Sequence, residues 1–306
     1  MGLAVARSGA NLAAGVFVPQ IYSLKMQAKF YAASVVPQIA NHDWEGEIAG
    51  KGDKVIIRKI PDIQIFDHVV NTDLPVQDVS DESITLNISY AKGYNFNVTY
   101  VDQYQSDIAI IEKLTDDATM QMKVAIDKSV LQSVYADVAT ANTVDWSGSA
   151  VRLGAGTTGI PLASLTTATY IQPLLFAGQA LDQNNIPREN RWAVINPLYA
   201  NYLKQSDLKQ VLTTGDDTSP LRNGYVGQID GMKIYVSNNL LNAIGATSGA
   251  PCSVLVGHTS ALAFASQFQK PEMLPNPRTF GTLVRGLNVY GFKTVKPEAM
   301  ARVLVY

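Results

Sequence analysis

The feature that most constrains this chain is a long run of helical apolar spacing between residues 107 and 139. No proline or glycine interrupts the run, and Ser106 or Asp107 can cap its first turn. A helix of this length would be ~45 Å long, whereas an average helix has only ~11–12 residues. No heptad partner accompanies it, so the pattern predicts a single spine helix on which other elements lie. Its apolar residues step by three or four: Ile108, Ile111, Leu114, Ala118, Met122, Ile126, Val130, Val134 and Val138.

The chain is poor in charge for its size. Hydrophobic residues make up 47% of its 306 residues and charged residues only 16%, against ~25% charged residues in an ordinary soluble chain. No stretch reaches the ~18 consecutive apolar residues of a membrane span. The low charge therefore indicates that much of the surface is covered by protein, and other copies of the same chain are the simplest cover.

Charge also argues against tight binding of nucleic acid. The net charge is −2, and no cluster of Lys and Arg supplies the basic face that phosphate neutralisation needs. Before Asp43 the chain carries Arg7, Lys25 and Lys29 and no acid. We interpret this stretch as a solvated arm, with weak contact to a polyanion as the alternative.

Residues 1–43 are unlike a folded domain. Ala, Gly, Ser and Gln are frequent, and Pro19 and Pro37 interrupt the stretch. Between the prolines, Ile21, Leu24 and Ala28 have helical spacing. We therefore expect an extended arm with a short amphipathic helix, which needs a partner surface because it has no core of its own. The early apolar run lacks a cleavage site, so no signal peptide is expected.

Residues 44–100 are rich in strand patterns. Apolar and polar residues alternate at 62–67, 83–90 and 95–100, and a β-rich run at 54–60 ends at Pro61. These patterns predict a long two-stranded loop that returns to a sheet.

The second half alternates between helix and strand patterns. We expect helices at 169–184 and 197–205, the latter capped by Asn196, and strands at 191–195, 231–236, 253–256, 287–292 and 301–305. Residues 142–165 are rich in Gly, Ser, Thr and Ala and are interpreted as a linker. Because a linker binds nothing, Gly156→Ala is expected to be tolerated.

The motifs that could carry chemistry are weak. Residues 154–159 match the dinucleotide fingerprint Gly-x-Gly-x-x-Gly, but Ile160-Pro161 follows where a helix should begin. His42, His68 and His258 have no neighbour at metal-ligand spacing, and the single Cys252 excludes a disulfide. The acid pair 116–117 lies on the helix, where neighbouring side chains diverge, and a cation at the loop pair 216–217 is the weaker alternative to a solvated loop. No catalytic residue, cofactor or metal site is expected.

The order of these elements resembles the major capsid proteins of tailed bacteriophages, whose shell fold is shared with herpesvirus capsids and encapsulins. Five segments are similar to family segments: NHDWEGEIAGKGDKV at 41–55, DKSVL at 127–131, IPRENRWAVI at 186–195, GMKIYVSNNL at 231–240 and RGLNVYG at 285–291. The similarity extends from about residue 20 to the end of the chain. No single segment is diagnostic, but their order is.

The resemblance implies an α+β phage major capsid fold. Its parts would be an N-terminal arm at 1–43, an extended loop (E-loop) at 44–85, and a peripheral domain at 86–165 with the spine helix and the Gly-rich linker. An α/β axial domain at 166–262 and returning strands at 263–306 would follow. Contacts between subunits are expected from the arm, the E-loop and its flank, at Ile21, Leu24, Ala28, Trp44, Lys51, Lys54, Arg58, Lys59 and Phe66.

The same resemblance implies function and partners. The chain would assemble into pentamers and hexamers of an icosahedral shell around double-stranded DNA, in the cytoplasm of a bacterial host. Expected partners are other copies of the chain, a separate scaffolding protein, a portal protein, possible decoration proteins and non-specifically contacted DNA, but no membrane. Two alternatives remain open: an encapsulin shell around an enzyme cargo, and a nucleotide-binding α/β enzyme that uses the Gly-rich segment.

Overall fold

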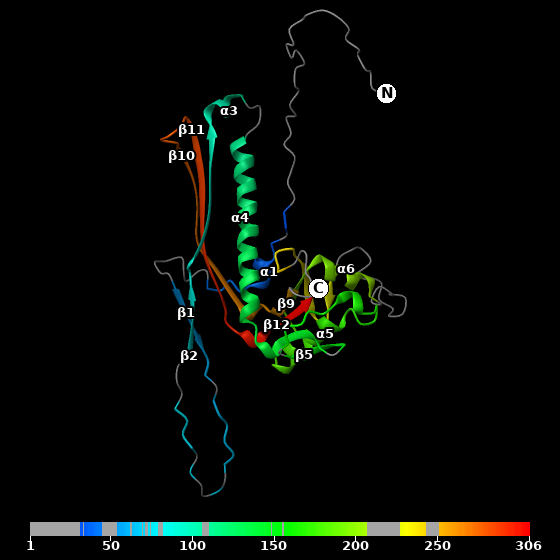
Figure 1. The fold of residues 1–306 in the computed structure, drawn as a ribbon. Helices are drawn as coiled ribbons and strands as arrows, with labels where there is room; N and C mark the ends of the chain where they lie inside the picture. Colours follow the sequence, from blue (N-terminus) through cyan, green and yellow to red (C-terminus); the bar gives the residue numbers. More distant parts are fainter. Residues whose placement is uncertain are drawn as a thin grey trace, which may run out of the picture.

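The computed structural model describes residues 31–44, 54–105, 110–206, 227–242 and 251–306, apart from positions 33, 62, 69, 71–72, 74, 79–81, 148 and 155. Within these residues the strands form a two-stranded hairpin, a three-stranded sheet and a seven-stranded sheet. One long helix stands between the two larger sheets, and the hairpin projects away from both (Figure 1).

The long helix predicted from the apolar spacing is α4, Ile110–Val134, with 25 residues. It is shorter than the expected 107–139. Residues 107–109 lie outside the described part, and after Val134 the chain tightens into a 3₁₀ turn, Tyr135–Asp137, and then becomes extended at Val138. Val138 is buried all the same. The predicted helix was too long at this end, because the extended chain after the helix also places an apolar residue in the core.

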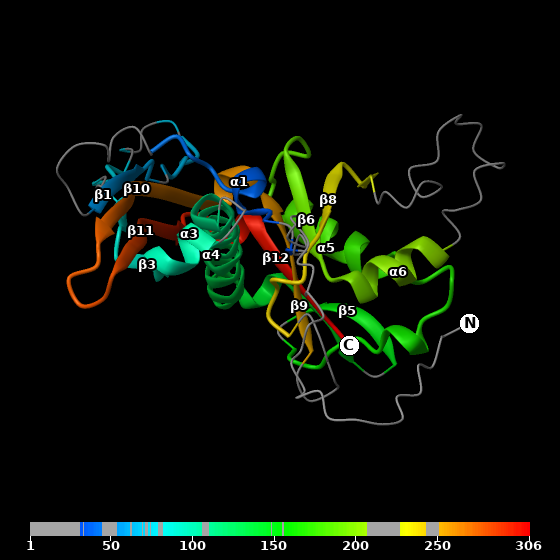
Figure 2. The ribbon, with the colours of Figure 1, turned by 90° about the horizontal axis from the view of Figure 1, so that it is seen from above.

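The three-stranded sheet has the order β10-β11-β3 and is antiparallel throughout. Its strands are β3 (Tyr90–Thr99), β10 (Leu262–Pro275) and β11 (Gly281–Thr294), and the short helix α3 (Tyr100–Gln105) continues β3 directly. Helix α4 packs against β3 and β11, as Figure 2 shows from above. In its second half α4 buries the predicted Met122, Ile126, Val130 and Val134, together with Leu131, which the prediction did not include. The predicted Ile111, Leu114 and Ala118 of the first half are only partly buried.

The hairpin pairs β1 (Lys54–Lys59) with β2 (Glu82–Asn87), from Lys54↔Asn87 to Lys59↔Glu82. Ile57 and Leu86 point into a small core shared with β10. The strand predicted at 62–67 is wrong for the described residues 63–67, which belong to no ladder. Alternation alone does not make a strand, because the backbone also needs a partner to bond. Here Gln64 N–H donates to the side chain of Gln77 instead (2.8 Å).

The seven-stranded sheet has the order β5-β4-β12-β9-β6-β8-β7. Helix α5 (Gln172–Gln183) packs against β4, β5, β9 and β12, and α6 (Pro197–Gln205) follows β6. Asn196 caps α6 as predicted, because its Oδ1 accepts from Tyr199 N–H at 3.0 Å. The strands are β4 (Thr143–Ser147), β5 (Ala150–Gly154), β6 (Arg191–Ile195), β7 (Gln228–Ile229), β8 (Met232–Val236), β9 (Cys252–His258) and β12 (Met300–Val305). Short 3₁₀ helices lie at Thr140–Asn142, Leu162–Ser164, Thr259–Ala261 and Pro297–Ala299.

The linker predicted at 142–165 is wrong. The segment holds β4 and β5, which pair as a hairpin, and β4 adds to β12 in parallel. Ile160 bridges to Val305, and Ile160 and Leu162 are fully buried. The Gly, Ser and Thr composition concealed two short strands whose stability comes from the neighbouring sheet, a tertiary effect that local composition does not report.

The N-terminal arm predicted at 1–43 also needs correction. The short helix α1 (Val36–Ile39) buries Val36 and Ile39 in the main core of the same subunit, and Val35 joins them. Asn41 then forms a parallel bridge with Ala263 of β10. The part of the arm from 34 to 41 therefore does have a core, whereas residues 1–30 lie outside the described residues.

Candidate assembly surfaces

The loop between β1 and β2 exposes apolar side chains far from the body of the subunit (Figure 1). Ile65 is 95% exposed, Val76 92% and Ile60 89%. Ile63 and Val70 are also exposed. Scattered exposed apolar residues are ordinary, but a concentration of them on one projecting loop marks a surface that binds another molecule.

The same loop is acidic. Residues 60–82 contain five aspartates and Glu82 but no Lys or Arg, the aspartates being Asp62, Asp67, Asp73, Asp78 and Asp81. At the base, β1 supplies exposed Lys54, Arg58 and Lys59, and Lys59 lies 3.4 Å from the Glu82 carboxylate. An acidic, apolar loop is thus carried on a basic strand.

The predicted contact residues do not converge on one site. Lys54, Arg58 and Lys59 are exposed on β1, and Phe66 is 36% exposed on the loop. Trp44 is half-buried and packs against the small core of Ile57 and Leu86. Its expected contact with another subunit stays a prediction. Ile21, Leu24, Ala28 and Lys51 lie outside the described residues.

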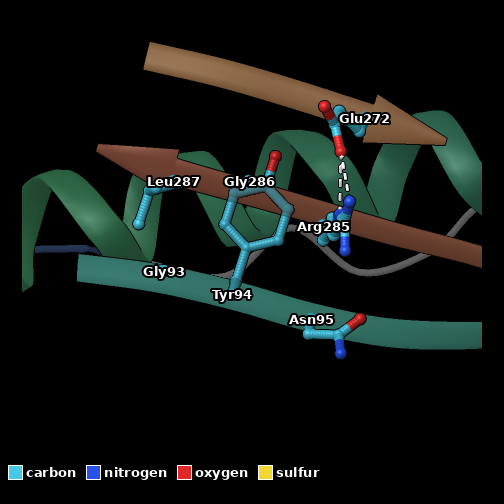
Figure 3. A pocket seen from close by; sticks show the side chains of 7 residues that line it. All are labelled: Gly93, Tyr94, Asn95, Glu272, Arg285, Gly286 and Leu287. Carbon is cyan, nitrogen blue, oxygen red and sulfur yellow. Dashed lines mark hydrogen bonds and ion pairs between the residues drawn. The ribbon is translucent and has the colours of Figure 1, made fainter. Parts of the chain in front are cut away.

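A hollow of about 510 Å³ lies on the three-stranded sheet, and sequence reasoning did not find it (Figure 3). Gly93 and Gly286 lie among the residues that line it. The ring of Tyr94 lies against Gly286, where an added Cβ would come within 2.5 Å of ring carbons. Arg285 closes one side through two hydrogen bonds to Glu272, at 2.9 and 2.6 Å. The only sequence signal was the segment RGLNVYG at 285–291, whose spatial neighbours are remote in sequence.

A second hollow, of about 480 Å³, separates β3 from the first half of α4. Tyr94 and Phe96 line it from the strand, and Leu114, Ala118 and Met122 from the helix. The sheet of β3, β10 and β11 therefore has an open depression on its helix side as well.

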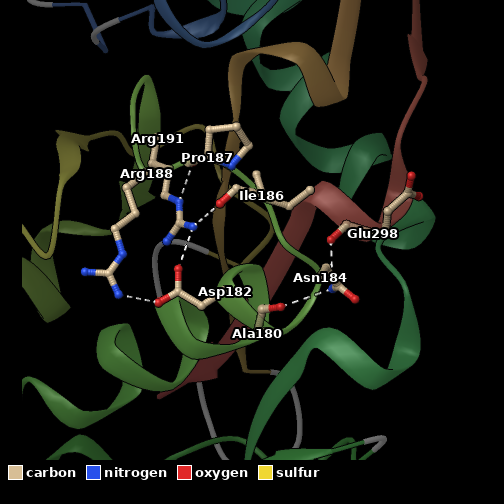
Figure 4. A network of polar contacts seen from close by, with 8 residues as sticks. All are labelled: Ala180, Asp182, Asn184, Ile186, Pro187, Arg188, Arg191 and Glu298. Carbon is tan, nitrogen blue, oxygen red and sulfur yellow. Dashed lines mark hydrogen bonds and ion pairs between the residues drawn. The ribbon is translucent and has the colours of Figure 1, made fainter.

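A polar network ties helix α5 to strand β6 (Figure 4). Arg191 is fully buried and donates to Asp182 at 2.7 Å and to the carbonyls of Pro187 and Ile186. Arg188 donates to the other oxygen of Asp182 at 2.6 Å. The Arg191 guanidinium, followed by Arg188, holds the pKa of the Asp182 carboxyl below its usual range, although desolvation opposes this. The network is a structural joint, since the Asp182 carboxylate on α5 binds Arg191 of β6 with one oxygen and Arg188 with the other.

The side chains that could act in catalysis or metal binding lie in environments that do not activate them. Burial raises the pKa of the Cys252 thiol to about 12, so the thiol stays protonated. Burial also lowers the pKa of His258, whose Nδ1 lies 2.8 Å from Ser260 Oγ. Among the described residues no group of three His, Cys, Asp or Glu could hold a metal ion. None of the described helices is both long and apolar enough for a membrane span.

The other two histidines, the acid pairs and the glycine fingerprint from the sequence form no ligand site among the described residues. His42 packs edge-on against Phe264, with ring centroids 5.6 Å apart, and His68 is exposed on the loop. Asp117 accepts from Gln121 Nε2 at 2.7 Å, and 216–217 lie outside the described part. The glycine fingerprint does not join a strand to a helix: Gly154 ends β5, and Ile160 enters the seven-stranded sheet.

Comparison with known proteins agrees with this description. A family model described as phage capsid protein matches residues 85–303, more than half of the chain. A solved structure from Mycobacterium phage Che8 is similar at 24% identity and a TM-score of 0.75, covering 95% of this chain and 98% of that one. The capsid structure of cyanophage P-SCSP1u follows at 16% identity and 0.70, with 95% and 93% covered. The capsid of an empty GTA particle gives 13% identity and 0.68, with 95% and 96% covered. No curated protein matches the chain.

The fold is thus that of a phage capsid subunit, with helices and sheets in the arrangement that the resemblance implied. The chain belongs to the phage capsid protein family and is a structural subunit of the virion capsid, which associates with its own copies into a shell. The predicted fold class and the predicted structural role are confirmed.

Proposed function

We propose that this subunit assembles into pentamers and hexamers of an icosahedral shell around double-stranded DNA, within the cytoplasm of a bacterial host. We further propose that it has no catalytic activity. A scaffolding protein would guide assembly, a portal protein would occupy one vertex, and decoration proteins and the packaged DNA would contact the finished shell. Membership of the phage capsid protein family supports these partners as a class.

The projecting loop between β1 and β2 carries the proposal. Its exposed apolar residues have no cover among the described residues of the subunit, and a shell provides one. Charge favours the three-stranded sheet of a second copy as that cover. Among the described side chains of β3, β10 and β11, the charged ones are Lys92, Arg285 and Lys293 against the acid Glu272. Residues 60–82, in contrast, contain six acids and no Lys or Arg. Opposite potentials of this kind steer association and fix its register.

The predicted E-loop residues would take part in this contact between copies. The exposed side chains of β1 include Lys54, Arg58 and Lys59, and Phe66 lies on the loop with the exposed isoleucines. Residues 54–87 would then act as the E-loop, α4 and the three-stranded sheet as the peripheral domain, and the seven-stranded sheet as the axial domain.

A loop variant tests the proposal. Changing Ile60, Ile63 and Ile65 together to Ser removes the apolar surface without touching the core, since all three are exposed. We expect a folded subunit, judged by circular dichroism, that forms few or no closed particles in negative-stain micrographs. Leu198→Ser on α6, where the side chain is 43% exposed, is the matched control and should form particles normally. Normal shells from the triple variant would contradict the proposal.

The contents of the particles test the cargo. Particles from an infected host should contain double-stranded DNA, measured by nuclease-protected nucleic acid after purification. A protein cargo without protected DNA would instead support the encapsulin alternative.

A further inference from the structure

Asp127 is a charged residue in the interior of the subunit. Its side chain lies on α4, and the residue is only 1% exposed. One carboxylate oxygen accepts from Val35 N–H and Val36 N–H, both at 2.8 Å, and from Ser34 Oγ at 3.1 Å. The other accepts from Asn239 Nδ2 at 2.7 Å. A buried carboxylate needs such compensation, because each lost bond exposes the cost of desolvating the charge.

The first oxygen serves as a cap supplied from another helix. Helix α1 starts after Val35, whose own side chain offers no acceptor for the free N–H groups of the first turn. Asp127 provides the acceptor and places negative charge at the helix start, where the helix dipole favours it. The start of α1 therefore depends on a residue about ninety positions later in the chain.

The chain before α1 follows α4 closely. The Tyr31 hydroxyl hydrogen-bonds to Asp117, and Val35 and Val36 bind Asp127. Ten helical residues span ~15 Å, a distance that the backbone from Tyr31 to Val36 and the long Tyr31 side chain cover together. The segment thus runs along α4 in the direction of the helix.

The segment after α1 is held at the other end. Val35, Val36 and Ile39 are buried, and Asn41 exchanges hydrogen bonds with β10: its N–H donates to Leu262 O at 2.8 Å, and its carbonyl accepts from Phe264 N–H at 3.0 Å. Residues 34–41, here called the strap, thus connect α4 to β10.

The second oxygen adds a third element. Asn239 lies in the turn after β8, where Ser237 N–H continues the ladder by donating to Ile195 O at 3.0 Å. Asn239 is buried, and its amide fixes one side of the carboxylate that caps the strap. The strap and the turn after β8 both bond Asp127.

We propose that Asp127 is a latch that makes the strap, helix α4 and the turn after β8 move as one unit. With the latch closed, the strap is held on α4 and on the turn after β8 at once. With the latch open, the strap loses its cap and is uncoupled from the seven-stranded sheet. Asn239 is a positioning residue for this latch, because its amide holds the carboxylate that caps the strap.

Hydrogen–deuterium exchange of the full-length protein tests the coupling. Asn239→Ala leaves every strap residue intact, yet it frees one carboxylate oxygen. We expect exchange at Val35 and Val36 to rise roughly tenfold, the effect of weakening one charged hydrogen bond. Asp127→Asn should raise it further, because the neutral amide keeps only one acceptor oxygen. Asp116→Asn, at an exposed position of the same helix, is the matched control and should change nothing in the strap.

A rise in strap exchange in Asn239→Ala, with exchange in β9 and β12 unchanged, supports the latch. Strap exchange that stays at the wild-type rate in a folded Asn239→Ala protein overturns it. If Asp127→Asn does not fold, Ser34→Ala and Asn239→Ala still decide the matter. Ser34→Ala removes the 3.1 Å contact alone and should raise exchange in the turn that contains Asn239; an unchanged turn would also contradict the coupling.

Discussion

Single residues decide whether the joints between elements hold, and Gly156 is one of them. An added Cβ at Gly156 would overlap the carboxylate of Asp145, which is buried in β4. At Gly154, two residues earlier, nothing lies within 4 Å of the added atom. From the sequence, Gly156→Ala was expected to be tolerated; from the structure, we expect it to destabilise the subunit.

Gly156→Ala should lower the free energy of unfolding by ~1–3 kcal/mol, the usual cost of overpacking. Gly154→Ala should change it by less than ~0.5 kcal/mol, as at other unobstructed positions. Urea unfolding followed by circular dichroism measures both. Equal stabilities of the two variants would show that the Asp145 carboxylate does not occupy this space.

Asp182 makes stability depend on pH. Its pKa is lowered in the folded subunit, mainly by Arg191, so the ionised form stabilises the fold above the unfolded-state pKa of ~3.9. This contribution is lost as the pH falls through the lowered value. Thermal melts from pH 5 down to pH 2.5 should show the decline, and Asp182→Asn should flatten it.

The Asp182→Asn variant should also be less stable than the wild-type subunit at pH 7. Arg191 is fully buried, and removing its carboxylate leaves an uncompensated charge, at a cost of about 3 kcal/mol. Arg188→Gln, whose partner is the same carboxylate but whose side chain is 68% exposed, should cost clearly less. If Arg188→Gln lost as much stability as Asp182→Asn, Arg188 rather than Arg191 would be the main partner of Asp182.

At the scale of elements, the sequence predicted what local patterns determine. Helix α4 follows from uninterrupted apolar spacing, and α6 follows from Asn196 and Pro197 at its start. Strand β6 was placed with its observed bounds, because a short apolar run between polar residues can only be buried as a strand there. Strands β4 and β5 were missed because their stability comes from β12, which lies about 150 residues later.

The candidate surfaces were predictable only in part. Lys54, Arg58 and Lys59 could be placed on the loop strand because the β-rich run at 54–60 predicts that strand, and charged side chains usually stay in solvent. The hollow at Gly93 and Gly286 could not, since it forms where two strands distant in sequence bring their glycines together. The packing of Trp44 against Ile57 and Leu86 was not predicted, because these residues are distant in sequence.

Ile126→Asp tests the packing of α4. Ile126 is 9% exposed in the main core, so the substitution would bury an unpaired carboxylate at a cost of several kcal/mol, about 3 or more. We expect insoluble protein or no particles. Met120→Asp, on a 48% exposed position of the same helix, should remain soluble. Soluble, folded Ile126→Asp protein would mean that another face of α4 meets the sheet.

At the scale of the whole molecule, the subunit is built to be incomplete alone. Two sheets flank one long helix, and the acidic, apolar loop extends away from them (Figure 1). Such a loop is a liability in a monomer and a contact in a shell. The low charge of the chain follows from the same geometry, because surfaces covered by neighbours need few solvated charges.

Electron cryomicroscopy of the purified protein, alone at high concentration or together with a scaffolding protein, tests this account most directly. We predict closed icosahedral particles with five- and six-subunit capsomers, in which residues 60–78 lie on the three-stranded sheet of a neighbouring copy. A stable monomer under all these conditions, with no particles, would contradict it.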